Sequence, residues 1–221
     1  MELYLDTANV EEIRELNKIL VIDGVTTNPT ILTRAGRDYR DSIREIRDLL
    51  TDDQKLFVQV VSEDLEGMIE EGRKIAALKK NAYVKIPLSD NGYMAIRQLH
   101  SEGIKILATT VFRDTEGIMA ARNGADYLAP YVNRMNNYCN GVKETISLQK
   151  MLRAYNMDTK VVAASFHYLD EVKQLMQNGI DALTVPTGIV RQMFRHEGSL
   201  DTIRNFSKTW KDNYNETSLD I

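Results

Sequence analysis

The chain has 221 residues, a formal net charge of −4 and 27% charged residues, which is the balance of an ordinary soluble globular protein. The acidic balance argues against a nucleic-acid partner, and no apolar run approaches the roughly 18 residues that a membrane helix needs. The single cysteine, Cys139, excludes an intrachain disulfide, and the N-terminus shows no signal-peptide pattern, so we expect a cytoplasmic protein.

Short β-rich runs recur along the chain, and a helix-like segment follows most of them. The expected strands are residues 2–7, 24–28, 56–61, 82–88, 105–112, 127–132, 160–166 and 181–186. Between them, stretches such as 9–20 and 63–80 are amphipathic, and in the second the apolar residues recur near a helical period. Strands that alternate with helices form a parallel sheet, and eight such units fit a (β/α)8 TIM barrel better than an open doubly wound sheet.

The segment 199–221 follows the eighth unit and predicts an extra C-terminal helix and tail. This helix could pack on the barrel or on a neighbouring subunit. The chain carries no linker rich in Pro, Gly or Ser and no low-complexity segment, so we expect residues 1–221 to form a single α/β domain.

Polar residues lie toward the carboxyl end of most of the expected strands. Residues two apart on a strand share a face, so Asp6 lies with Tyr4, and Ser165 lies with Ala163. One inward Thr or Gln is usually a hydrogen-bonded filler of the barrel, but a converging set predicts a pocket at the C-terminal mouth, where TIM barrels collect catalytic groups. The converging residues are Asp6, Thr26, Asn28, Gln59, Lys85, Thr109, Tyr131 and Ser165.

Lys85 lies in the middle of "AYVKIPL", a run that reads as a strand covered on both sides. Burial lowers the pKa of a lysine, and a neutral amine can attack a carbonyl to form a Schiff base. Tyr131 and Asp6 are the candidates for moving protons to and from the substrate hydroxyls. The alternative interpretation is an ion pair between Lys85 and Asp6 that joins two strands without any chemistry.

Five motifs resemble those of a known family. "LYLDTANVEEI", "GVTTNPTIL", "YVKIPLS", "APYVNRM" and "VVAASF" resemble the small class I aldolases of the transaldolase family, in particular its fructose-6-phosphate aldolase branch. The resemblance runs from Met1 to about residue 212, with the motifs in the same order and at nearly the same spacing. It implies a (β/α)8 barrel that cleaves and forms ketose phosphates through a lysine imine, without a metal or another cofactor.

The resemblance also implies roles for the residues of the proton-transfer machinery. Lys85 matches the Schiff-base lysine, and Asp6 matches the carboxylate that assists it. Tyr131 matches the phenol that acts as general acid and base, helped by a water that Gln59 and Thr109 would hold.

Four further residues match the groups that bind the substrate. Asn28 matches the amide that contacts the donor's hydroxyls, and Thr26 helps to hold the site. Arg134 and Ser165 match the groups that bind the acceptor's phosphate, which suits the forked guanidinium of an arginine. The expected partners are therefore sugar phosphates and further copies of the chain, because the resemblance implies a homo-oligomer, either a pentamer or a decamer.

Two positions favour one branch of this family. Transaldolases carry Glu and Phe where this chain has Gln59 and Tyr131. A phenol can exchange a proton with a substrate hydroxyl and phenylalanine cannot, so we expect fructose 6-phosphate to be cleaved into free dihydroxyacetone and glyceraldehyde 3-phosphate. The alternatives are a transaldolase that needs a sugar acceptor, and a non-catalytic sugar-phosphate binder.

Some positions depart from the pattern of the family. Asn136 stands where relatives usually have Asp, Cys139 lies in a loop that is usually richer in glycine, and His167 replaces a common lysine or arginine. These changes leave the identity of the acceptor open. We expect Thr110 to point outward without a role. The three histidines show no ligand spacing, so no metal site is expected.

Overall fold

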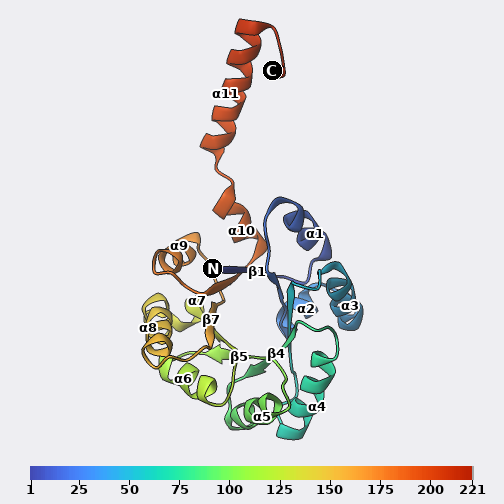
Figure 1. Cartoon of the computed structure of the whole chain (residues 1–221), viewed down its shortest axis with the longest axis vertical. Helices are drawn as coiled ribbons and strands as arrows, with labels where there is room; N and C mark the ends of the chain where they lie inside the picture. Colours follow the sequence, from blue (N-terminus) through green and yellow to red (C-terminus); the bar gives the residue numbers. More distant parts are fainter. Residues whose placement is uncertain (221) are drawn as a thin grey trace.

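Eight parallel strands close into a barrel, in the order β1 to β8, with helices around it (Figure 1). The structure is a computed structural model that describes residues 1–220, so the last position of the predicted C-terminal tail, residue 221, lies outside it. The predicted TIM barrel is confirmed. The strands are β1 (Glu2–Asp6), β2 (Gly24–Thr26), β3 (Lys55–Gln59), β4 (Ala82–Pro87), β5 (Ile106–Val111), β6 (Tyr127–Pro130), β7 (Lys160–Ala163) and β8 (Ala182–Val185).

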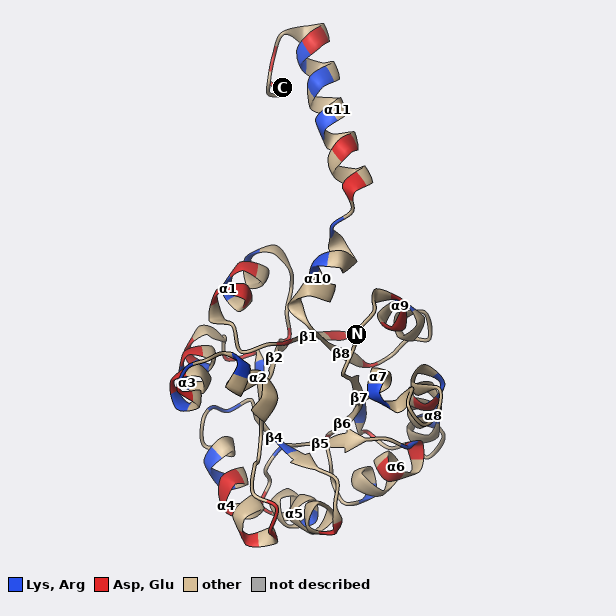
Figure 2. Cartoon of the chain, turned by 180° about the vertical axis from the view of Figure 1, so that it is seen from behind, with Lys and Arg blue, Asp and Glu red and all other residues tan. Residues whose placement is uncertain are grey.

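Most of the helices follow the strands and form the outer layer, where many of the charged residues lie, and the last helix extends beyond it (Figure 2). They are α1 (Val10–Ile19), α2 (Pro29–Arg34), α3 (Tyr39–Leu49), α4 (Leu65–Ala76), α5 (Asp90–Ser101), α6 (Asp114–Arg122), α7 (Val132–Met135), α8 (Gly141–Ala154), α9 (Leu169–Gln177), α10 (Thr187–Phe194) and α11 (Glu197–Tyr214).

Local sequence explains where these helices begin and which face they bury. Asn9 caps α1, because its side chain accepts hydrogen bonds from the backbone N–H groups of Glu11 and Glu12. Ile13 and Leu16 of the same helix are buried one turn apart, as a single apolar stripe requires. None of the helices formed by residues 1–220 combines the length and apolarity needed to cross a membrane.

The buried apolar residues of the described chain form two separate clusters. The larger lies between the strands and the outer helices. The smaller fills the barrel and is rich in aromatic rings: Tyr4, Phe57, Tyr83, Leu107, Tyr127, Ala129, Val162, Ala164 and Ala182. The rings of Phe57 and Tyr83 stack with their centroids 4.9 Å apart. Because side chains alternate along a strand, the residues two positions beyond these rings, Gln59 and Lys85, face the interior as predicted.

The prediction that Ala163 shares the inward face of the seventh strand with Ser165 was wrong. Val162 lies in the interior cluster, whereas Ala163 packs in the outer one. The strand ends at Ala163, and Ser165 follows with a left-handed φ of 62°. Several predicted strands were also too long at their carboxyl ends, because the chain leaves the barrel there, at the mouth. β2, for example, ends at Thr26, and Asn28 is already the cap of α2.

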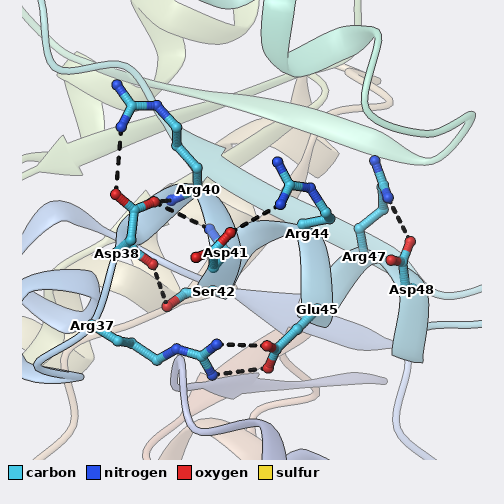
Figure 3. A network of polar contacts seen from close by, with 9 residues as sticks. All are labelled: Arg37, Asp38, Arg40, Asp41, Ser42, Arg44, Glu45, Arg47 and Asp48. Carbon is cyan, nitrogen blue, oxygen red and sulfur yellow. Dashed lines mark hydrogen bonds and ion pairs between the residues drawn. The ribbon is translucent and has the colours of Figure 1, made fainter.

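The outer face of α3 shows how the surface charges pair locally (Figure 3). Arg37 donates two hydrogen bonds to the carboxylate of Glu45, and Arg44 bonds Asp41 at 2.9 Å. These groups are largely exposed, so water and salt screen each pair and it adds little to the stability of the fold.

The amino-terminal end of the barrel holds a charged cluster around Glu2. Its carboxylate accepts hydrogen bonds from the hydroxyls of Tyr4 and Tyr127 and lies 3.1 Å from the amine of Lys55 and 2.9 Å from that of Lys160. Burial acts to raise the pKa of Glu2, but the hydrogen bonds from these two tyrosines and two lysines outweigh it and lower the pKa to about 2. The ionised carboxylate therefore stabilises the folded barrel.

We expect Glu2→Gln to lower the free energy of unfolding at neutral pH by on the order of 1 to 2 kcal/mol, allowing for partial solvent screening. The contribution of Glu2 is complete above its ordinary pKa of 4.5 and is lost as the pH falls toward about 2. The variant and the parent chain should therefore converge across that window. Urea unfolding at a series of pH values measures this, with the exposed Glu63→Gln as the control. A difference that stays constant down the series would contradict the assignment.

Candidate active site

A buried amine lies at the carboxyl end of the barrel. Lys85 extends from β4 and is 5% exposed, and its Nζ donates a hydrogen bond of 2.8 Å to the backbone carbonyl of Thr27. Burial lowers the pKa of Lys85 to about 8, and the negative charge of Asp6 opposes that shift. About a quarter of such amines are neutral at pH 7.5, against about one in a thousand for a pKa of 10.5.

The ion pair between Lys85 and Asp6 that the sequence left open does not form as a direct contact among residues 1–220. Asp6 is instead held by Thr26, whose hydroxyl donates to Asp6 Oδ1 at 2.9 Å. The same hydroxyl lies 2.6 Å from the hydroxyl of Thr184 on β8. A hydroxyl has one proton to donate, so Thr184 is the donor to Thr26. Burial raises the pKa of Asp6, and the charges of Lys85 and Arg134 and the Thr26 hydrogen bond oppose the shift.

Thr184 is the site residue that the sequence analysis missed. It lies two residues beyond Ala182, which belongs to the interior cluster, so the alternation that identified Asp6 also predicts an inward Thr184. The signal was present in "DALTVP", but a single threonine near the end of the last strand resembles an ordinary barrel filler.

Tyr131, Thr109 and Gln59 provide a second group of polar atoms. The hydroxyl of Thr109 donates to that of Tyr131 at 3.0 Å. Burial raises the pKa of Tyr131, while the Thr109 hydrogen bond and the charge of Arg134 act in the opposite direction. The phenol therefore keeps its proton at neutral pH. Gln59 Oε1 is buried without a hydrogen-bond partner among the described residues, so this carbonyl is available to a water or a substrate group.

Asn28 follows β2, which pairs with the strand of Gln59, and it is the cap of α2. Its Oδ1 accepts a hydrogen bond of 3.0 Å from the backbone N–H of Ile31, which fixes the orientation of the amide. Within the described chain, no hydrogen bond uses the amide nitrogen of Asn28, so both of its protons are available to hydroxyls of a ligand.

Arg134 and Ser165 lie in the neighbouring segments that follow β6 and β7. Arg134 belongs to α7, is exposed, and has its guanidinium carbon 5.0 Å from the centre of the Tyr131 ring. No carboxylate in residues 1–220 pairs with it, so its charge is available to an anion. Ser165 is half-buried, and its backbone carbonyl accepts a hydrogen bond from the N–H of Asn133 at 3.0 Å. The strand alternation used to predict its direction fails here.

Thr110 has a structural contact that the sequence analysis did not assign. Its hydroxyl accepts a hydrogen bond of 3.0 Å from the backbone N–H of Leu88 and donates to the carbonyl of Thr109. It therefore ties the end of β5 to the segment after β4. Over the described part of the chain, no group of three His, Cys, Asp or Glu side chains is arranged to hold a metal ion.

Comparison with known proteins relates the chain to one family. It matches the family described as Transaldolase/Fructose-6-phosphate aldolase over residues 3–220. A protein of Clostridium acetobutylicum named "Probable transaldolase" is 37% identical over 217 residues, which cover 98% of this chain and 100% of that protein. A protein of the same name from Aquifex aeolicus is 37% identical over 212 residues, or 96% of this chain and 97% of the other.

Comparison with solved structures supports the architecture. A structure described as "Native KDPGal structure" matches with a TM-score of 0.56 and 17% identity, over 84% of this chain and 81% of the other. At that identity the likeness concerns the fold alone.

We expect acylation of Lys85 by acetic anhydride to rise with pH through a midpoint near 8, because only the neutral amine reacts and burial lowers its pKa. Asp6→Asn removes the charge that raises this pKa, so it should move the midpoint lower. Peptide mass spectrometry of the labelled chain measures both. The chemically denatured chain is the control, since an ordinary lysine titrates near about 10.4. A native midpoint that matched the denatured one would contradict the assignment.

Proposed function

This chain belongs to the transaldolase/fructose-6-phosphate aldolase family, and from that premise we propose that it is a class I aldolase. Its reaction is the reversible cleavage of fructose 6-phosphate into dihydroxyacetone and glyceraldehyde 3-phosphate. The observation that carries the proposal is the buried Lys85 amine, which has a pKa of about 8 and no direct carboxylate partner among the described residues.

In the proposed mechanism the neutral amine of Lys85 attacks the ketone carbon and gives a carbinolamine. Tyr131 donates its proton to the departing hydroxyl, so that water leaves and a protonated imine and a phenolate remain. The raised pKa of Tyr131 supports this order, because the resting phenol holds its proton and its phenolate is a strong base.

The phenolate then takes the proton of the substrate's C4 hydroxyl, and the bond between C3 and C4 breaks. Its electron pair moves into the imine, which becomes a neutral enamine, and the aldehyde leaves. Tyr131 next protonates the enamine carbon, and water adds to the imine to release dihydroxyacetone and restore the Lys85 amine. Gln59 and Thr109 hold the water that relays these protons, and the unpaired Gln59 Oε1 supports that role. Asp6 assists Lys85 through its charge.

The remaining site residues bind the two halves of the substrate. Asn28 contacts the hydroxyls of the donor half with its free amide protons, and Thr26 keeps Asp6 in position. Arg134 and Ser165 bind the phosphate of the acceptor half.

The single cysteine of the chain supports a location in the reducing cytoplasm.

A transaldolase is the second candidate, because the relatives from two bacteria carry that name. It would use the same lysine and fold but pass the dihydroxyacetone unit to an aldose phosphate. The phenol of Tyr131 and the neutral amide of Gln59 favour the aldolase, since they suit hydrolysis of the enamine through a relayed water.

We expect steady release of glyceraldehyde 3-phosphate from fructose 6-phosphate alone, because Tyr131 and the water proposed at Gln59 and Thr109 can protonate the enamine without an acceptor. A coupled dehydrogenase assay, with and without erythrose 4-phosphate, measures the release. Release only in the presence of the acceptor would make this enzyme a transaldolase.

Two variants control this assay. Lys85→Met should abolish both turnover and trapping of the ketone by borohydride, while thermal unfolding shows a folded barrel. Tyr131→Phe should reduce cleavage far more than borohydride trapping, since imine formation can also draw protons from water. An active Lys85→Met chain would exclude the imine mechanism.

We further propose that the protein is a homo-oligomer, a pentamer or a decamer, in which α11 packs on a second copy. α11 extends away from the barrel (Figure 1), and none of its residues is buried within the described chain. Its apolar residues recur at helical spacing, and Ile203 and Phe206 are 58% and 69% exposed. Such a stripe on a monomer would be exposed to water.

We expect the pair Ile203→Asp and Phe206→Asp to lower the molar mass in solution, because it places charges on the apolar stripe. Size-exclusion chromatography with light scattering measures this. The pair Asn205→Asp and Lys208→Glu changes the polar face of the same helix and should leave the mass unchanged. An equal effect of the two pairs of substitutions on the molar mass would contradict packing through the apolar stripe of α11.

A further inference from the structure

The two loops that carry Arg134 and Ser165 are joined by backbone hydrogen bonds. The N–H of Val132 donates to the carbonyl of Ala164 at 2.9 Å, and that of Asn133 donates to the carbonyl of Ser165 at 3.0 Å. The beginning of α8 lies equally close to α7, since a Cβ at Gly141 would come within 2.0 Å of the Val132 carbonyl oxygen. The short helix α7 is therefore held from both sides.

A buried carboxylate, Glu171 in the first turn of α9, adds a side-chain connection between the same loops. Glu171 is 7% exposed. Its Oε1 accepts hydrogen bonds from the amide nitrogens of Asn133 at 2.8 Å and Asn136 at 3.2 Å. Its Oε2 accepts from the backbone N–H groups of His167 at 3.1 Å and Tyr168 at 3.3 Å. No lysine or arginine of residues 1–220 pairs with it, so neutral N–H groups supply all of its partners.

Asn136 is suited to this carboxylate in a way that an aspartate is not. Its Oδ1 accepts a hydrogen bond of 3.0 Å from the N–H of Gly141, so its amide nitrogen is the atom that faces Glu171. An aspartate here would place a second carboxylate oxygen next to Glu171, which costs free energy in a buried site. Asn136, which replaces the aspartate usual in the family, and the Glu171 carboxylate therefore form a matched donor and acceptor pair.

The geometry points to Glu171 as a positioning residue for the anion-binding part of the site. It holds α7 against the loop after β7, so that Arg134 and Ser165 face one anion. Both residues need such support. α7 has four residues, too few to be stable alone, and Ser165 adopts a left-handed φ of 62° that is unfavourable for a residue with a Cβ. Hydrogen bonds fix the backbone on both sides of Ser165.

This inference rests on the proposed function only in naming the anion as the phosphate of a sugar. In Glu171→Gln, the new amide NH₂ group faces N–H donors that the carboxylate of the parent chain satisfies. We expect the Kd for inorganic phosphate and the KM for fructose 6-phosphate to rise about tenfold, the equivalent of one lost hydrogen bond to a charged group. Borohydride trapping of dihydroxyacetone, which has no phosphate, should stay unchanged.

The decisive variant exchanges the two groups. Asn136→Asp alone places two carboxylates together and should weaken phosphate binding at least as much as Glu171→Gln. In the double variant, the introduced glutamine accepts from the backbone N–H groups and donates to the introduced aspartate, whose other oxygen still accepts from Gly141. Asn133, whose amide nitrogen donates to Glu171 in the parent, turns its amide so that its Oδ1 accepts the second proton of the glutamine. We expect phosphate affinity to return to within about threefold of the parent. Asp170→Asn is the matched control, because Asp170 is an exposed neighbour whose carboxylate bonds only Gln174 within residues 1–220.

Isothermal titration calorimetry with inorganic phosphate and steady-state kinetics provide the readouts. If the double variant binds phosphate no better than the single ones, or if Glu171→Gln lowers only the melting temperature, the positioning role is wrong. A parent chain that traps dihydroxyacetone but binds no phosphate also overturns it. A chain that traps no ketone, yet binds phosphate with the expected pattern across the variants, supports the role of Glu171 and overturns the aldolase proposal.

Discussion

The rest of the structure depends on one constraint, which is that a lysine amine must lie inside a barrel without becoming a structural ammonium ion. Burial lowers the pKa of Lys85 to about 8, and a carboxylate in direct contact would reverse that shift. Asp6 is kept from such contact because Thr26 bonds it, with Thr184 bonded in turn to Thr26. The amine instead donates to a neutral carbonyl, that of Thr27. The charge of Asp6 therefore acts on Lys85 from a distance, which leaves the nitrogen able to lose its proton.

Two strands that supply a polar group to the mouth also supply an aromatic ring below it. Tyr83 lies two residues before Lys85, and Phe57 lies two residues before Gln59, with both rings stacked in the interior cluster. The ionised Glu2 and its lysines and tyrosines lie at the other end of the barrel. Stability and chemistry are thus separated along the barrel axis. The free energy lost by burying polar atoms at the mouth is offset by aromatic packing on the same strands.

The succession of strands and helices in the sequence predicted the barrel, and the alternation of side chains along each strand predicted the inward direction of Lys85 and Gln59, because both lie within regular strands. It failed at Ser165, where the strand has already ended and the backbone turns through a left-handed φ. It could not find Glu171 at all. The partners of that carboxylate are two side chains on another loop and two backbone N–H groups, and neither spacing nor composition marks such a set. Residues whose role depends on loop geometry need the structure.

The neutral amide at Gln59 also affects the charge balance around Lys85, apart from the water-holding role proposed for it. Gln59 pairs in register with Lys85 on the neighbouring strand, and both side chains point into the barrel. A glutamate at this position would add a second carboxylate to a site that already holds the half-buried Asp6. It would favour the ammonium form of Lys85, and the repulsion between the two carboxylates would raise the pKa of Asp6 further. With Gln59, the site holds one carboxylate beside one amine, and in the proposed mechanism the Tyr131 phenol carries the protons that a second carboxylate would otherwise move. The choice of amide and phenol at these two positions therefore follows from the charge balance around Lys85.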